Sequence, residues 1–204
     1  MNRLIRTPTD PAEMRARILE VADEQFRRIG YQKTSVADIA SELGMSAANV
    51  YRFFSSKGDI VESICGRVVD EVADIAFAIA RTSAPASEKL TRLLAAVHHH
   101  SKTTLTKEKR VHDMIVAAMR ENRAIIKAHI EQMVGIFEAI IREGIEAGEF
   151  MVEDSGEAAR AVNTAFMPFF HPILLEHCPR HGEGLGAGLR EQTRFILKAL
   201  GKSD

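Results

Sequence analysis

The stretch KTSVADIASELGMSAANVYRFFSSKGDI, residues 33–60, decides the fold of this chain. In its first half, Ser35 is followed three residues later by Asp38, which is the spacing of a capping box at a helix start. Apolar residues then recur at helical spacing. The pattern predicts a short helix whose apolar face consists of Val36, Ile39, Ala40 and Leu43.

A tight turn separates this helix from a second one. Gly44 can adopt the left-handed conformation that ends a helix, and Ser46 can cap a second helix over residues 47 to about 54. Val50 and Phe54 lie four residues apart and would enter the same small core. The two helices predict a helix-turn-helix. The outer side of its second helix, which can reach DNA, carries Ala47, Ala48, Asn49, Tyr51 and Arg52.

Composition favours a folded chain with one large or two small domains, since 46% of its 204 residues are apolar. No apolar targeting segment follows Met1, and no run approaches the roughly 18 apolar residues of a membrane span. We therefore expect a cytoplasmic protein that does not enter the membrane. Cys65 and Cys178 lie far apart without a metal-binding spacing, so free thiols are expected.

The charge of the chain is unusual for a DNA-binding protein. Its net charge is −1, and residues 1–60 contain nine Lys or Arg against eight Asp or Glu. DNA-binding domains are usually more basic than this balance of +1. Affinity for DNA must therefore depend on where individual charges lie.

Helical patterns continue through the rest of the chain. A first helix over residues 10–30 begins with Asp10 as its cap and Pro11 at its first position. A helix over residues 57–81 would span about 35 Å and link two parts of the molecule. No strand pattern occurs. We predict an all-α fold of about nine helices, with a three-helix domain at residues 1–56 and a larger helical domain at residues 57–204.

Two prolines near the C-terminus leave the course of one helix open. The helix that begins after Ser155 either continues through Pro168 and Pro172 with a kink or ends near Met167. The glycine-rich residues 178–188 are expected to form a loop.

Four motifs in the first 65 residues resemble the N-terminal signature of the TetR family of bacterial transcriptional regulators. They are Thr34-Ser35-Val36-x-Asp38-Ile39-Ala40, Gly44-Met45-Ser46, Val50-Tyr51-Arg52-x-Phe54 and Ser56-Lys57. The remainder resembles the family in architecture, including Gly144-x-x-x-Gly148-Glu149-Phe150. The resemblance implies a helical homodimer, with a DNA-binding domain, a linking fourth helix, and a C-terminal domain that binds a small molecule. It also implies a repressor that the ligand releases.

Phosphate contacts are expected at helix starts. Ser46 and the N–H groups of Ala47 and Ala48 form a helix N-terminus that suits a phosphate. The resemblance implies that Tyr51 and Lys57 contact phosphates, and it adds Thr34 and Ser35 at the start of the preceding helix. A packing role for Tyr51 is the alternative.

Base contacts are expected to be few. Asn49 can pair with adenine, the methyl groups of Ala47 and Ala48 can meet thymine methyls, and Arg52 can reach a guanine or a phosphate. Arg52 is otherwise a solvated side chain. Because so few contacts discriminate bases, we expect a homodimer on a pseudo-palindromic operator. The candidate interface combines the helices at 162–174 and 189–200, unless both apolar stripes are buried within one subunit.

The effector is expected to be small and apolar or amphipathic. Its candidate pocket is lined by Phe77, Met114, Met119, Met133, Phe137, Phe166, Phe169, Phe170 and His171, although core packing accounts for each of these residues equally well. We expect binding to shift the helix that begins at Lys57 and so to weaken operator binding.

Other kinds of site find little support. The histidines at 98–100, and the group of His171, His177, Cys178 and His181, lack the spacing of metal ligands. No catalytic set or cofactor site can be named, so an enzyme is disfavoured. An all-helical module that binds a protein instead of DNA remains the alternative.

Overall fold

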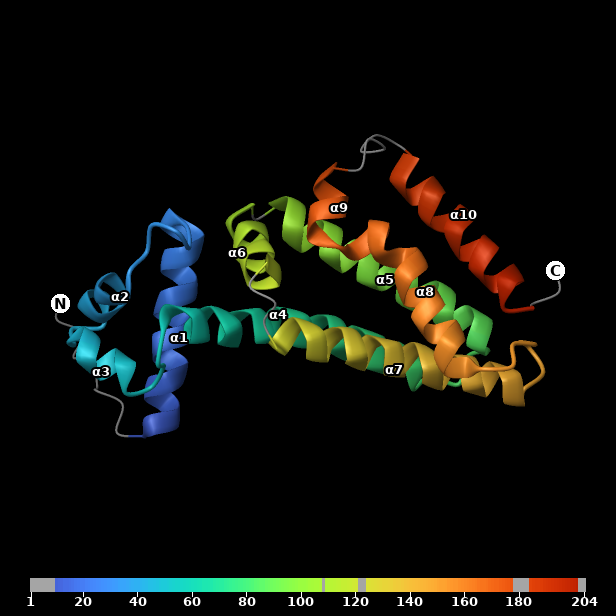
Figure 1. The fold of residues 1–204 in the computed structure, drawn as a ribbon, viewed down its shortest axis with the longest axis horizontal. Helices are drawn as coiled ribbons and strands as arrows, with labels where there is room; N and C mark the ends of the chain where they lie inside the picture. Colours follow the sequence, from blue (N-terminus) through green and yellow to red (C-terminus); the bar gives the residue numbers. More distant parts are fainter. Residues whose placement is uncertain (1–9, 108, 121–123, 178–183, 202–204) are drawn as a thin grey trace.

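The computed structural model describes residues 10–107, 109–120, 124–177 and 184–201, which form ten α-helices and no strand. The all-α prediction is confirmed. Figure 1 shows a small part made of α1 to α3, from which α4 runs into a larger bundle made of α5 to α10. None of the described helices combines the length and apolarity that a membrane span requires.

The first three helices begin where their capping residues predict. α1 (Pro11–Ile29) has Asp10 as N-cap, whose Oδ1 accepts a hydrogen bond from the Ala12 N–H at 3.0 Å. α2 (Val36–Glu42) follows the N-cap Ser35, and α3 (Ala47–Tyr51) follows the N-cap Ser46. The starting points of these three helices are therefore set by local hydrogen bonds that the sequence encodes.

The second helix of the motif is shorter than predicted, because it ends at Tyr51 and not near residue 54. The N–H groups of Arg52 and Phe53 bond to carbonyls three residues back, at 3.3 and 2.9 Å, which tightens the last turn and closes the helix. Phe54 lies beyond this turn and is still buried in the core, with 2% of its surface exposed.

α4 (Lys57–Ala80) connects the two parts of the molecule. Its N-cap, Ser56, accepts a hydrogen bond from the Asp59 N–H at 3.1 Å. The helix contacts α1 and α6 as well as α5 and α7. A displacement of α4 within the bundle would therefore also move the end of α4 that packs against α1.

The larger part consists of α5 (Ala86–Lys107), α6 (Lys109–Arg120), α7 (Ala124–Glu146), α8 (Ser155–Phe170), α9 (Pro172–His177) and α10 (Gly184–Ala199). α8 continues through Pro168 and ends at Phe170, because His171 is extended, with ψ 125°. Pro172 then occupies the first position of α9, where its missing N–H costs nothing. This break produces the tenth helix, one more than predicted.

The expectation of a loop over residues 178–188 is wrong for its second half. α10 begins at Gly184, so Gly184, Gly186 and Gly188 are helical. Leu189 and Ile196 are buried where α10 packs against α8 and α5. Tertiary packing therefore outweighs the low helix propensity of glycine. The first half, residues 178–183, lies outside the described residues.

Two apolar cores stabilise the fold, and α6 belongs to the first. That core joins residues of α1 to α4 with Val111, Met114, Ile115 and Ala118 of α6. The Arg110 guanidinium also donates a hydrogen bond to the carbonyl of Arg27 at 2.7 Å, near the C-terminus of α1, where a cation is favoured. Apolar packing therefore continues across the domain boundary expected at residues 56 and 57.

Candidate DNA interface and effector cavity

The starts of α2 and α3 are held by their caps. Ser35 Oγ accepts from the Asp38 N–H at 3.2 Å, and Asp38 Oδ2 accepts from the Ser35 N–H at 2.8 Å, which completes the predicted capping box. Hydrogen bonds from the side chain and backbone of Ser35 lower the pKa of Asp38 below its ordinary value. At α3, Ser46 Oγ accepts from the Asn49 N–H at 3.3 Å.

One side of α3 faces solvent and the other faces the core. Val50 is fully buried and Ala47 is partly buried against the first core. Ala48, Asn49 and Arg52 are exposed, and Tyr51 exposes 51% of its surface. Of the side chains predicted to contact DNA from this helix, Ala48, Asn49, Tyr51 and Arg52 are therefore exposed, whereas Ala47 packs in part against the core.

Two basic side chains of this part form bonds within the protein. Arg15 Nη1 donates to the carbonyl of Phe53 at 2.6 Å, and its guanidinium lies 4.0 Å from the centre of the Phe54 ring. Lys57 Nζ donates to the carbonyls of Tyr31 and Thr34, at 2.9 and 3.0 Å. Both cations therefore tie loops of the helix-turn-helix to neighbouring helices.

Thr34 is also turned inward. Only 1% of its surface is exposed, and its hydroxyl donates to the carbonyl of Gly30 at 3.0 Å. Of the residues expected at phosphates, Thr34 and Lys57 thus have polar groups that already bond to backbone carbonyls. Ser35, Ser46 and Tyr51 are exposed.

The remaining basic side chains fall into two groups. Arg17, Arg27 and Arg28 form ion pairs with Glu20, Asp23 and Glu42, at 3.2, 2.9 and 3.8 Å. Lys33 and Arg52 are exposed and have no ion-pair or hydrogen-bonding side-chain partner within the described part of the chain. Sequence reasoning named Arg52 but missed Lys33, which lies two residues before the cap of α2.

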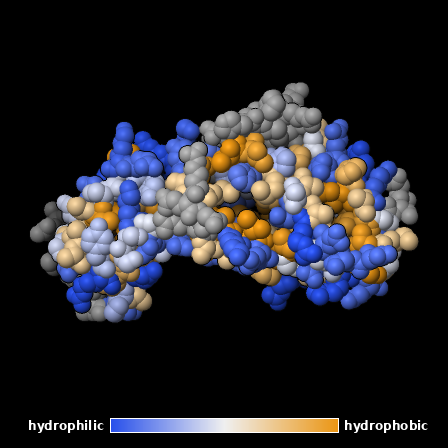
Figure 2. Space-filling view, in the orientation of Figure 1, coloured by the Kyte–Doolittle hydropathy of each residue, from blue (hydrophilic) through white to orange (hydrophobic). Residues whose placement is uncertain are grey.

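The bundle encloses a cavity of about 120 Å³. Its walls come from α4, α5, α6, α7 and α8, and from the His171–Pro172 junction before α9. Figure 2 shows apolar residues gathered around a hollow in this part of the surface. The cavity is the candidate effector site of the chain.

Five of the nine predicted pocket residues line this cavity: Met119, Met133, Phe137, Phe170 and His171. Phe77 instead points to solvent with 43% of its surface exposed, and Met114 is buried in the first core against α1. Phe166 and Phe169 pack on each other in the second core, with ring centroids 5.7 Å apart. These four residues lie outside the cavity walls.

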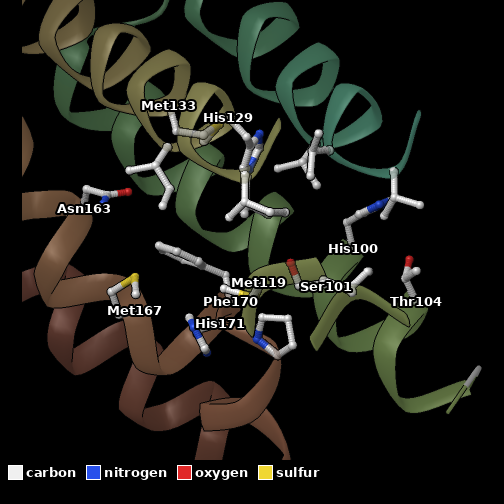
Figure 3. Close-up of a pocket in the computed structure, with 18 of the residues that line it drawn as sticks. His100, Ser101, Thr104, Met119, His129, Met133, Asn163, Met167, Phe170 and His171 are labelled. Atoms are coloured by element: carbon white, nitrogen blue, oxygen red, sulfur yellow. The ribbon is translucent and has the colours of Figure 1, made fainter. Parts of the chain in front are cut away.

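Several polar residues that the sequence did not assign to the pocket also line the cavity, namely His100, Ser101, Thr104, His129 and Asn163. Figure 3 shows His129 and His171 on opposite sides of the space, with His100 and Thr104 toward one end. No Asp, Glu, Lys or Arg is among the lining residues within the described part of the chain. The walls therefore combine apolar surface with neutral hydrogen-bonding groups.

Two of the lining histidines have lowered pKa values. Burial lowers the pKa of His171, and it also lowers that of His129, where the charge of Asp70 opposes the effect in part. Nδ1 of each ring is buried and has no hydrogen-bond partner among the residues that the structure describes. Among the described residues, no three His, Cys, Asp or Glu side chains are grouped in a way that could hold a metal ion.

Comparison with known families agrees with this geometry. Residues 18–64 match a family model described as bacterial regulatory proteins, tetR family, and residues 86–183 match one described as tetracyclin repressor-like, C-terminal domain. The chain belongs to the TetR family. It is therefore a helix-turn-helix transcriptional regulator that binds DNA, and this family is not one of enzymes.

Individual relatives extend the similarity over most of the chain. The transcriptional repressor KstR2 of Mycolicibacterium smegmatis is 28% identical over 151 residues, which cover 71% of each chain. A TetR/AcrR-family regulator from Thermobifida fusca has a TM-score of 0.62 and 25% identity, over 91% of this chain and 97% of that one. FadR of Thermus thermophilus, solved with lauroyl-CoA, has a TM-score of 0.66 and 17% identity, over 91% and 94%.

Proposed function

We propose that this TetR-family regulator is a cytoplasmic homodimeric repressor, which a small apolar or amphipathic effector releases from a pseudo-palindromic operator. The observation that carries this proposal is that the helix-turn-helix core and the cavity share residues. Val68 of α4, and Ile115 and Met119 of α6, pack in or against the first core, and all three also line the cavity. A molecule that moves the cavity walls therefore moves the helices on which α1 rests.

Effector binding and DNA binding are coupled because α4 and α6 can adopt two alternative arrangements. In the dimer, a small rotation of each helix-turn-helix changes the separation of the two α3 helices. An effector that favours the arrangement with the wrong separation weakens DNA binding, by a coupling free energy of typically ~1–3 kcal/mol. Because linkage is reciprocal, the operator weakens effector binding by the same factor.

Base recognition rests on the exposed side of α3. Asn49 is the residue suited to a bidentate pair with adenine, and the methyl groups of Ala47 and Ala48 suit thymine methyls. Arg52 lies at the C-terminal end of the same helix, where it reaches either a guanine or a phosphate. Two alanines at reading positions leave few hydrogen bonds per half-site, so the second subunit supplies much of the specificity.

Phosphate contacts come from the residues around these helices. Ser46 places an exposed hydroxyl at the N-terminus of α3, and the Tyr51 hydroxyl is exposed to a phosphate. Ser35 is exposed at the start of α2, but its hydroxyl already donates to Asp38 Oδ2 at 2.6 Å, so a phosphate would compete with this bond. Lys57 and Thr34 act mainly through the local structure, since a phosphate near Lys57 would share its ammonium with two backbone carbonyls. Lys33 adds a cation beside α2.

The dimer forms through residues 162–174 and 189–200, on α8, α9 and α10. Phe195 exposes 68% of its surface and Leu174 exposes 41% in the single chain. Full burial of such a side chain stabilises an association by about 1.5–3 kcal/mol. A two-fold axis beside α10 would cover Phe195 in both subunits at once.

The solved relatives are consistent with an effector in the bundle. SmeT was solved in complex with triclosan, and RolR was solved with resorcinol. Both share this fold at low sequence identity, 19% and 13%, so they support the presence of a ligand site and do not identify the ligand of this chain.

Selection of bound duplexes from a random DNA pool tests this function. We expect an inverted repeat whose half-sites lie about one helical turn, or ~34 Å, apart. Enrichment of a single unrepeated site would contradict the dimeric mode. If no sequence were enriched, operator binding itself would be refuted and a protein partner for α3 would be favoured.

A further inference from the structure

The described walls of the cavity do not suit a charged ligand. Among the lining residues that the structure describes there is no acid, lysine or arginine, so none of them offers an opposite charge in direct contact to a charged group inside. Two carboxylates of α4 lie beside lining histidines: the charge of Asp70 acts on His129, and Glu71 Oε2 lies 3.7 Å from His100 Nε2. Both residues are exposed, so solvent screens their charges; they repel anions and give a cation only a screened partner outside the lining residues. Burial of an unpaired charge costs far more than burial of a neutral polar group.

The lining histidines favour a hydroxyl group. Nδ1 of His129 and Nδ1 of His171 are buried and form no hydrogen bond with any described residue. A neutral imidazole nitrogen is either a donor or an acceptor, depending on the tautomer. A hydroxyl can pair with either form because it both donates and accepts. Such a pair would satisfy a polar atom that is costly to leave unpaired.

The size of the cavity limits the ligand to about one ring. Its volume is about 120 Å³. An apolar protein cavity of about 150 Å³ accepts benzene. A long acyl chain or a nucleotide would need walls that open much further, whereas a ring with one or two small substituents matches the space.

We propose that the effector is an uncharged, single-ring molecule whose hydroxyl group pairs with His129 or His171. This assignment rests on the proposed role of the cavity as the effector site. The ring lies against the apolar residues contributed by α4, α6 and α7, such as Val72, Ile115 and Met133. The hydroxyl points to one of the two histidines that face each other across the space in Figure 3.

Four probes of similar size test the assignment on the unaltered protein: p-cresol, toluene, benzoate and benzylamine. Binding of each is measured by titration calorimetry without DNA, up to about 10 mM ligand, since so small a ligand binds in the micromolar to millimolar range. We expect p-cresol to bind about tenfold more tightly than toluene, because it pairs a buried nitrogen. Benzoate and benzylamine should bind about 100-fold more weakly than p-cresol or not at all.

Variants then locate the hydroxyl contact. Either His129→Leu or His171→Leu should weaken p-cresol binding about tenfold and leave toluene binding unchanged or tighter. His99→Leu is the matched control, because His99 is exposed on α5 and does not line the cavity. Circular dichroism verifies that each variant is folded. If a variant does not fold, the comparison of the four probes on the unaltered protein still tests the assignment.

Three results would overturn the assignment: equal affinity for p-cresol and toluene, a charged probe that binds as tightly as p-cresol, or no saturable binding of any probe. These titrations need no operator. Their failure is therefore distinct from a failure of the duplex selection, which tests the proposed function in the absence of any effector.

Discussion

Lys33→Gln should lower the salt dependence of operator binding. Of the described basic side chains between residues 10 and 60, Lys33 and Arg52 are exposed and unpaired, while the others bond within the protein. Binding to phosphates releases counterions from DNA, and only cations that reach phosphates contribute to this release. A nearly neutral domain should therefore owe much of its salt dependence to these two residues.

The size of the effect follows from the dimer. Each neutralised phosphate contributes about 0.9 to the slope of log K against log salt concentration, so removal of Lys33 from two subunits should reduce the slope by about 1.8. Between 50 and 200 mM KCl, a fourfold change, the variant should lose about tenfold less affinity than the unaltered protein does. Removal of both Lys33 and Arg52 should double the reduction in slope to about 3.6, which corresponds to a difference on the order of 100-fold over the same salt range, if Arg52 contacts a phosphate.

Fluorescence anisotropy with a labelled operator, repeated across a series of KCl concentrations, measures the slope. Arg17→Gln serves as the control, because Arg17 is exposed on α1 and already pairs with Glu20 at 3.2 Å. Its slope should match that of the unaltered protein. An unchanged slope for Lys33→Gln, or an equal fall in slope for Arg17→Gln, would refute the claim that unpaired cations contribute more to the salt dependence than paired ones do.

Three further results are expected. Asn49→Ala should relax base preference at one position of each half-site, by about 1–3 kcal/mol, as read by duplex selection with the variant; retained preference would exclude Asn49 as a base contact. Gly144→Ala should destabilise the fold by about 1–3 kcal/mol in urea unfolding, because its Cβ would overlap the buried Phe150 ring, whereas Gly135→Ala on the same helix meets nothing and should be neutral or stabilising. Because the pKa of Asp38 is lowered in the folded state, its contribution to stability is present above its ordinary pKa of 3.8 and is lost as pH falls below it. Thermal unfolding of Asp38→Asn should therefore show a weaker acid dependence, and an identical pH profile would contradict the role of the capping box.

The local structure of the helix-turn-helix could be predicted because its determinants are close in sequence. Asp10, Ser35 and Ser46 cap the helices that they were expected to cap, since a cap bonds to N–H groups two or three residues away. The length of α3 was overestimated, because the tight turn at Arg52 and Phe53, where the Phe53 carbonyl also accepts a hydrogen bond from Arg15 of α1, leaves no pattern in the sequence.

The cavity could be predicted only in part. Met114 and Met119 lie five residues apart on one helix and so about 140° apart around its axis, but the spacing does not show which neighbour each residue meets. Met114 turns toward α1, while Met119 reaches the cavity. His129 was missed because a single polar residue on a helix carries no pattern, and its significance depends on the surrounding helices. Which residues line the cavity therefore depends on how helices from distant parts of the chain pack together.

The position of α6 has a consequence for protein engineering and for the evolution of modular regulators. Because Val111, Met114, Ile115 and Ala118 complete the core under α1 and α4, a fragment cut at residue 56 would expose an apolar face and lose the Arg110 bond to the end of α1. A working chimera must carry α6 with the DNA reader or receive a helix of matching shape from its new partner. Exchange of operator specificity between such proteins is therefore constrained by a helix that never approaches the reading side of α3.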